Sequence, residues 1–421
     1  MGFFGRKRAP SVPHPRKEPR FDGPLTLKRL EQIFQDCVDF TKRPVSLGEG
    51  GACTLTLCYL SGMVKMERVS DYVLRPLAQD EALARCGTPR QAMEEMMGGA
   101  LYNLSAAERT TLDEAAFDLV AGWCLMFFPG ESAVLSLFVG TEEKRSISSP
   151  SNETVLKGSR DAFVESLRTN TSIVRRHLKT PELRIREQVV GRQSVTSVDI
   201  LYIEGLTNPH LVEQVAAQLA DIDIDAVLAT GNIEEYIVPA ARTAFPLVQY
   251  TERSDRFCAG LAEGRVGILI DGLPLGYLAP GVLGDFLQAP QDKSESWLLA
   301  SALTLLRYLC MLTTLFLPAL YIAAVTFHPE MLPTKLTLSI IAAKQDVPFR
   351  SVFEVIVLLL AFEILQEAGL RLPQSIGQTV SIIGGLVVGS AAVEAKIISP
   401  AVLIVVAIAG IAGYTMPSQE V

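Results

Sequence analysis

The chain has 421 residues, enough for two or three domains, and a formal net charge of −8 at pH 7. This acidic balance excludes a protein that binds nucleic acid through its overall charge. The hydrophobic fraction of 49% is high for a water-soluble protein, and the most apolar segments lie in the last quarter of the chain. The composition therefore predicts a large polar region followed by a compact membrane domain.

Residues 1–24 form a basic, proline-containing arm that includes Arg6, Lys7, Arg8 and Arg16. The arm lacks the apolar core of a secretory signal. We expect it to be disordered. Contact with anionic lipid headgroups is the alternative, because each basic residue near such a surface contributes about 1 kcal/mol.

Residues 25–150 are predicted to form a first α/β lobe. Its apolar runs are short and are bounded by glycine, which favours buried strands joined to helices. The elements expected are a strand over 52–62 ending at Gly62, helices over 66–77 and 113–127, and a strand over 133–139.

Residues 151–290 are predicted to form a linker helix and a second α/β lobe with the same pattern. Asn208 and Pro209 are typical of an N-cap and a first helical residue. The elements expected are a strand over 198–205, helices over 208–219 and 253–263, and a strand over 266–270. The repeated order indicates two related α/β lobes.

The segment that joins the lobes is basic and has a helical pattern from Ser159 onward. Phe163, Leu167 and Val174 fall near one face, and the arginines lie largely off it. A solvated face with a few ion pairs is one interpretation. A basic surface that docks on a partner or on the membrane is the other.

Residues 297–421 are predicted to form a helical membrane domain. Residues 308–327 are free of charge and long enough to cross a bilayer as a helix. Two further apolar segments cover residues 376–393 and 398–414. Arg307, just before the first segment, is expected to extend toward the membrane interface.

A helix over 350–369 carries Glu354, Glu363 and Glu367 between apolar runs. Carboxylates at membrane depth usually face a water path or a protein interior. These residues and Gln378 are therefore candidates for lining or gating a pore. The alternative is an interfacial helix with its carboxylates in water.

A stripe of small residues recurs every four positions at Gly377, Ser381, Gly385 and Gly389. Such stripes allow helices to approach closely in lipid. We expect this face to pack against another helix, with a pore-lining face as the alternative.

The sequence contains no recognisable catalytic motif. The seven cysteines and four histidines are scattered, without the spacing of a metal site. We therefore expect no enzyme activity, no metal and no cofactor. Gly260, Gly264, Gly267 and Gly272 are interpreted as turn and strand-edge glycines.

Several stretches resemble the A subunits of bacterial spore germinant receptors, the GerA family. In the polar region the resemblance is carried by Gly158, Arg160, Glu165, Asn170, Arg175, Arg176, Thr251, Glu252, Arg253, Asp255, Asp271 and Gly272. In the membrane part it is carried by 347–349, 362–365, 367–369 and 377–381. One departure is Ser254, where the family usually has proline.

The resemblance implies a cytosolic two-lobed region and several spans in the inner spore membrane. It also implies B and C partner subunits and a homo-oligomeric, nutrient-gated ion channel. The family continues beyond the position of Val421, so the chain is expected to lack the last span. The alternatives are an accessory protein that resembles stage V sporulation protein AF and amplifies ion release, or a truncated, non-functional remnant.

Overall fold

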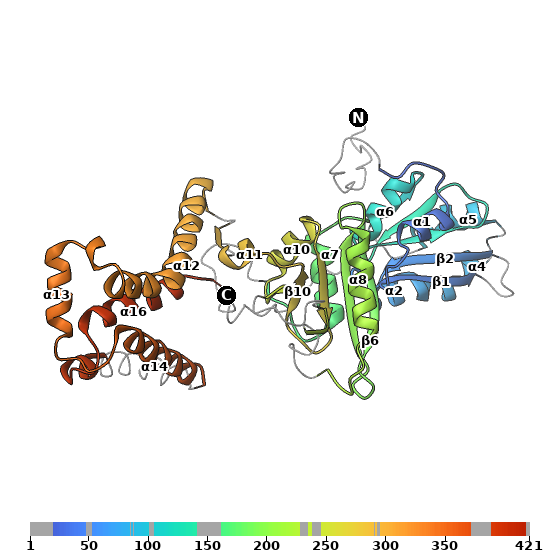
Figure 1. The fold of residues 1–421 in the computed structure, drawn as a ribbon. Coiled ribbons are helices and arrows are strands. Elements are labelled where there is room, and N and C mark those ends of the chain that lie inside the picture. The colour runs from blue at the N-terminus through green and yellow to red at the C-terminus, as the bar shows by residue number, and fades with distance from the viewer. Residues whose placement is uncertain are drawn as a thin grey trace. The chain divides into compact units, whose positions relative to one another are not determined.

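The computed structural model divides into two compact units, Met1–Gly281 and Val282–Val421, each described here by itself (Figure 1). It describes residues 20–47, 53–84, 86, 88–100, 105–140, 161–227, 235–237, 246–289, 291–292, 295–371 and 389–417.

The first lobe is built on a five-stranded sheet with the spatial order β1-β2-β4-β5-β3. Every neighbouring pair of strands is antiparallel. The strands are β1 (Phe40–Leu47), β2 (Cys53–Leu60), β3 (Ala106–Arg109), β4 (Trp123–Phe127) and β5 (Val134–Phe138). All five residues of β4 are buried, because helices cover both faces of the sheet.

Helices α1 and α6 pack on one face of this sheet and the helices between β2 and β3 pack on the other. Thr111 caps α6 by accepting a hydrogen bond from the Glu114 N–H. The helices are α1 (Leu27–Ile33), α2 (Met66–Val69), η1 (Ser70–Leu74), α3 (Arg75–Gln79), α4 (Glu81–Ala84), α5 (Pro89–Glu95), η2 (Met96–Ala100) and α6 (Leu112–Val120).

The second lobe has a five-stranded antiparallel sheet with the order β6-β7-β9-β10-β8. Helix α8 covers one face, and α7 and α10 cover the other. The elements are α7 (Leu167–His177), β6 (Leu183–Val190), β7 (Thr196–Ile203), α8 (Pro209–Ala220), β8 (Gln249–Thr251), α10 (Ser254–Ala262), β9 (Val266–Ile270) and β10 (Gly276–Ala279).

The two lobes share one strand order, because β1 to β5 occupy the same relative positions as β6 to β10. The helices also correspond, with α1 and α6 placed as α7 and α10 are. The prediction of two related α/β lobes is confirmed in part, because strands and helices share each lobe in the same order but both sheets are antiparallel. The Asn208 cap is confirmed as well, since its side chain accepts a hydrogen bond from the His210 N–H.

The prediction of one helix over 113–127 is wrong at its C-terminal end. Helix α6 ends at Val120, and β4 follows it. The chain turns at Gly122, whose φ of +86° is easily reached only without a side chain. The predicted pattern matched the strand over 133–139, which is β5, to the strand over 266–270, which is β9. This match is wrong by one strand, because the counterpart of β9 is β4.

The second unit contains helices of very different length. They are α11 (Leu283–Leu287), α12 (Trp297–Thr326), η4 (Pro329–Met331), α13 (Thr334–Lys344), α14 (Ser351–Arg371) and α16 (Pro400–Gly413). Among the described residues, α12 alone is long and apolar enough to cross a membrane. Only 6% of the residues in an apolar stretch of 18 residues within α12 are buried in the structure.

Helix α12 begins eleven residues before the predicted start, so Arg307 lies inside the helix and not at its end. Arg307 does not extend freely from a helix end as expected, and its position relative to a membrane interface stays a prediction. Its guanidinium is buried and bonds the Asp292 carboxylate at 3.0 Å and the Leu287 carbonyl at 3.2 Å. A buried arginine needs such partners because its charge is costly to remove from water.

Candidate functional site

The two lobes are joined by direct hydrogen bonds within the first unit. The Val38 N–H donates to the Ile185 carbonyl at 3.0 Å, which links the start of β1 to the edge strand β6. Arg175 of α7 bonds the Asp39 carboxylate at 2.9 and 3.0 Å. Both side chains are buried. Burial opposes the charge of Arg175, but attraction to Asp39 outweighs it and raises the pKa of Arg175.

Of the two interpretations of the segment that joins the lobes, the geometry agrees with the one in which the arginines form ion pairs. Helix α7 starts at Leu167, and the described residues 161–166 before it are not helical. Arg175 points into the lobe junction, and Arg168 bonds Glu187 and Asp199 on the second sheet. Neither arginine belongs to a free basic face.

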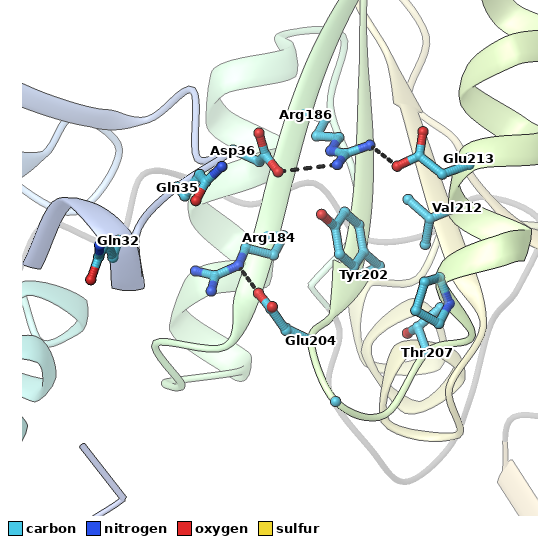
Figure 2. Close-up of a pocket in the computed structure, with 12 residues that line it drawn as sticks. Gln32, Gln35, Asp36, Arg184, Arg186, Tyr202, Glu204, Thr207, Val212 and Glu213 are labelled. Carbon is cyan, nitrogen blue, oxygen red and sulfur yellow. Dashed lines mark hydrogen bonds and ion pairs between the residues drawn. The ribbon is translucent and has the colours of Figure 1, made fainter. Parts of the chain in front are cut away.

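A cleft of about 260 Å³ lies beside this junction (Figure 2). We call it the inter-lobe cleft. It is lined by Gln32, Gln35, Asp36, Arg184, Arg186, Tyr202, Glu204, Gly205, Thr207, Pro209, Val212 and Glu213. The first three come from the end of α1 and the turn after it, and the rest come from β6, β7, α8 and the turn between them. Both lobes therefore form its walls.

Arg186 is held in the cleft between two carboxylates, as Figure 2 shows. It bonds Glu213 at 2.7 Å and Asp36 at 3.1 Å, and its guanidinium lies 5.7 Å from the centre of the Tyr202 ring. Burial works against its charge, but the hydrogen bonds to Glu213 and Asp36 outweigh burial and raise the pKa of Arg186. Its buried Nε atom has no hydrogen-bond partner among the described residues.

Arg184 forms a second ion pair in the cleft, with Glu204, and also contacts the Ile33 carbonyl of the first lobe. The wall thus presents cations and anions within one small volume. Such a surface suits a small polar solute that carries charges of both signs, because each charge of the solute finds a partner. The cleft was not predicted from the sequence. Arg184 and Arg186 alternate with apolar residues on a strand, and that spacing places both on one face.

Most of the motif residues named from the sequence stabilise the start of α7 and α10. Asn170 accepts a hydrogen bond from the Val164 N–H at 2.8 Å and donates to the Val164 carbonyl. Asp271 caps α7 by accepting from the Leu167 N–H at 3.1 Å. Thr251 accepts from the Arg253 N–H at 3.1 Å. These contacts support a structural role.

The remaining described motif residues, apart from Arg175 and Arg176 near the end of α7, lie around the same two helix starts. The Gly272 N–H donates to the Glu165 carbonyl at 2.8 Å, and the Phe163 N–H donates to the Glu252 carbonyl at 2.8 Å. Asp255 bonds Arg253 at 2.6 Å. Arg176 is half-buried at the end of α7. Gly158 and Arg160 lie outside the described residues.

Ser254, the departure from the family pattern, is the first residue of α10. Its backbone N–H and its hydroxyl both donate to the Asp161 carbonyl, at 3.3 and 3.1 Å. A proline could make neither bond. The hydroxyl also lies 3.1 Å from His177 Nε2, but the Asp161 carboxylate faces the same ring nitrogen, so the three do not form a catalytic triad. No group of three or more His, Cys, Asp or Glu side chains that could hold a metal ion occurs in the described part of the chain.

Asp199 is a buried carboxyl beside the lobe junction. Its Oδ2 accepts hydrogen bonds from Thr171 at 3.0 Å and Arg168 at 3.3 Å, and its Oδ1 has no hydrogen-bond partner in the described part of the chain. Burial raises the pKa of Asp199 from 3.8 to about 6, although Arg168 and Thr171 act in the opposite direction. The folded form therefore holds this proton more tightly than the unfolded chain does.

This shift predicts a pH-dependent stability. Protonated Asp199 supports the fold fully below about pH 4, and that support is lost as the pH rises through about 6. In the wild type, the unfolding free energy should fall by roughly 2–3 kcal/mol over this interval because of Asp199. In Asp199→Asn this fall should be absent. Urea denaturation of a fragment covering residues 20–281 at several pH values measures it. The exposed Asp223 is the control, and its Asn variant should keep the wild-type profile. Parallel profiles for Asp199→Asn and wild type would refute the prediction.

The three glutamates of α14 lie in different surroundings. Glu354 is buried and accepts a hydrogen bond from the Ser399 N–H at 2.7 Å. Glu363 and Glu367 are on the opposite, exposed side of the helix. Glu363 also lines a cavity of about 320 Å³, together with Thr314, Gln366 and residues of α16. Glu363 has no ion-pair partner among the described residues, so its charge is available to water or to another chain.

The small-residue stripe is described only at its end. Gly389 lies against Leu403 of α16, since an added Cβ would meet its methyl groups at 3.3 and 3.5 Å. This contact agrees with helix packing at that position. Gly377, Gln378, Ser381 and Gly385 lie outside the described residues, so their roles stay predictions.

Comparison with known proteins decides the family. Residues 28–421 match the family model described as Bacillus/Clostridium GerA spore germination protein. The chain belongs to the GerA family. It is 37% identical to spore germination protein KA of Bacillus subtilis (strain 168) over 90% of this chain and 69% of that protein. It is also 37% identical to the uncharacterized membrane protein YfkQ of the same strain, over 93% of this chain and 75% of that protein.

Another GerA family relative is spore germination protein GerLA of Bacillus cereus, 33% identical over 94% of this chain and 79% of that protein. Among solved structures, the N-terminal domain of the A subunit of the Bacillus megaterium spore germinant receptor GerK3 matches at 27% identity. That match covers 61% of this chain and 94% of the other, with a TM-score of 0.47.

Proposed function

We propose that this chain is the A subunit of a spore germinant receptor, a membrane protein that converts nutrient binding into ion release. The observation that carries the proposal is the GerA family match over residues 28–421. The division into a two-lobed unit and a helical unit with an apolar helix supports it, because a sensor and a membrane module are then parts of one chain.

The inter-lobe cleft is the proposed recognition site. Its walls come from two lobes, so a bound solute would contact both and favour one arrangement of them over others. The paired arginines and carboxylates suit a small nutrient with charges of both signs. The B and C subunits are the proposed partners of the assembled receptor.

The helical unit is proposed to form the ion pathway in the inner spore membrane, with the lobes on the cytosolic side. Several copies would place α14 around a central axis, where Glu363 and Glu367 favour cations. Exposure of both side chains in the single chain supports this arrangement. Gln378 on the next segment is a further candidate for lining the path.

Replacing Glu363 by Gln tests the pathway. Glu363→Gln should reduce potassium release several-fold in spores that carry this gene as their germination receptor, while the protein level stays unchanged. The loss of a negative charge at the pathway is the physical reason. The exposed Glu330, outside the long helices, is the control, and Glu330→Gln should leave release unchanged. Equal release from both variants would mean that Glu363 is interfacial and that the pore lies elsewhere.

A further inference from the structure

Four helices of the second unit bring polar groups together at one buried point. Tyr321 belongs to α12, Lys344 ends α13, Glu354 lies in the first turn of α14, and Ser399 caps α16. We call these four residues the polar junction. Apolar residues of α14 and α16 surround it, and Tyr321 packs against the same cluster. Polar groups are rarely collected in such surroundings without a ligand or a partner.

Glu354 is the centre of the polar junction. It is only 1% exposed, which is exceptional for a glutamate. Its Oε2 accepts a hydrogen bond from the Ser399 N–H at 2.7 Å, at the start of α16. The helix N-terminus therefore stabilises one side of the carboxylate. The other oxygen, Oε1, faces the remaining residues of the junction.

Three oxygens of the polar junction have no hydrogen-bond partner among the described residues. They are Glu354 Oε1, the Tyr321 hydroxyl and the Ser399 hydroxyl. The Tyr321 hydroxyl lies near Ser399 and within electrostatic reach of Glu354, but without hydrogen-bond geometry. A buried polar atom left without a partner costs about 1–3 kcal/mol. A cation bound by these oxygens would give all three a partner beside the one negative charge.

Lys344 supplies the positive charge nearest to these oxygens. Its Nζ lies 3.5 Å from Glu354 Oε1 and also contacts the Ser351 hydroxyl. The distance to Oε1 is that of an ion pair and is too long for a hydrogen bond. The lysine side chain is 27% exposed, so its ammonium reaches the junction from the surface at the end of α13. Because the lysine side chain is flexible, its ammonium group can move out of the polar junction.

We propose that Glu354, Tyr321 and Ser399 form a binding site for a monovalent metal cation, and that the Lys344 ammonium closes this site. Carboxylate and hydroxyl oxygens are the ligands that hard cations prefer. The site holds one negative charge, which one monovalent ion neutralises and a divalent ion would exceed. Two cations so close repel each other, so Lys344 and the metal ion compete.

The cation site goes beyond the proposed function, because it concerns binding within one chain and needs no pore. Glu354 lies on the packed side of α14 and not on the exposed side with Glu363. An ion bound there would displace Lys344 and loosen the contact between α13 and α14. Ion release in Glu363→Gln tests the proposed pore, and ion binding in the Glu354 variants tests the cation site. Either proposal can therefore fail without the other.

Thallium binding to the full chain in lipid nanodiscs tests the proposal, since Tl⁺ is a measurable substitute for monovalent metal ions. Lys344→Met should bind Tl⁺ about tenfold more tightly than wild type, a difference of about 1.4 kcal/mol. Lys344→Arg keeps the charge and should bind like wild type. Lys335, an exposed lysine at the other end of α13, is the matched control, and Lys335→Met should change nothing.

Removing the Glu354 carboxylate tests whether it is the residue that binds Tl⁺. Glu354→Gln in the Lys344→Met background should abolish Tl⁺ binding, while its amide oxygen still accepts from the Ser399 N–H. Circular dichroism of the same samples verifies the fold, and Tyr321→Phe in this background serves as a milder variant that should weaken binding. Equal affinities for Lys344→Met and wild type would overturn the proposal. So would Tl⁺ binding that survives both the Glu354→Gln and the Tyr321→Phe changes.

Discussion

Arg175→Met should lower the unfolding free energy of a fragment covering residues 20–281 by about 3–5 kcal/mol. The substitution leaves the Asp39 carboxylate buried at the lobe junction without its guanidinium. It also frees the Leu183 carbonyl, which accepts from Arg175 at 3.0 Å. The fragment contains four buried hydrophobic clusters of its own, so urea denaturation of it measures the effect.

An exposed ion pair of similar length provides the control for this variant. Arg192 and Asp223 are 2.7 Å apart, with side chains 69% and 68% exposed. Arg192→Met should cost less than about 1 kcal/mol. The double variant Arg175→Met/Asp39→Leu should regain much of the loss, because no charge is then left buried without a partner. A cost below about 1 kcal/mol for Arg175→Met would show that the junction is not held by this pair.

Phe257→Ala should destabilise the same fragment by about 3–5 kcal/mol. The ring is fully buried between α10 and the second sheet, and it meets Phe163 edge-on at 5.3 Å. Two glycines make room for it, since an added Cβ at Gly267 or Gly276 would lie 2.4 or 2.6 Å from its atoms. Loss of the ring leaves a cavity that the rigid strands cannot fill.

Leu206 is the matched control, because it is a large apolar residue of the same lobe that is 51% exposed. Leu206→Ala should change the unfolding free energy by no more than about 0.5 kcal/mol. Thermal unfolding followed by circular dichroism compares the two variants directly. A Phe257→Ala fragment that melts with the Leu206→Ala fragment would contradict the assignment of Phe257 as a core residue.

The strands predicted from the sequence, over 52–62, 133–139, 198–205 and 266–270, are mainly apolar runs that end at or before a glycine. Strand β9 was predicted at the observed bounds, since VGILI is buried on both faces and ends before Asp271-Gly272. Strand β1 was missed because it is a sheet edge with exposed polar residues and contains Pro44. The helix over 113–127 was overextended because β4 is as apolar as the helix before it.

The roles of the four glycines could be predicted only in part from their positions in the sequence. Gly264 and Gly272 have φ of +89° and +84° and are turn residues, as expected. Gly260 and Gly267 were wrongly assigned to the same class. They lie inside α10 and β9, where the absent side chains admit Leu278 and Phe257. Only the contact between separate elements reveals this role.

The candidate site was harder to predict than the fold because its residues come from distant segments. Asp36 and Arg186 are 150 residues apart in the sequence, and a single sequence carries no signal that pairs them. In the second unit, by contrast, Glu354, Glu363 and Glu367 stand out in the sequence because charge is conspicuous in an apolar helix, and their role at a pore stays a prediction. The helical spacing of 3.6 residues per turn places Glu354 opposite Glu363 and Glu367. The partners of these glutamates cannot be derived from that spacing.

The two lobes differ in the exposure of a tyrosine at one equivalent position. Tyr59 of β2 faces Thr41, and its counterpart Tyr202 of β7 faces Arg184. The first tyrosine is buried beneath the longer helical layer of its lobe, and the second is partly exposed and lines the cleft. In the first lobe the tyrosine is thus part of the core, and in the second lobe its counterpart is accessible at the cleft. Under the proposed recognition role, substitutions of Tyr202 would alter the surface of the cleft without disturbing the core of the first lobe.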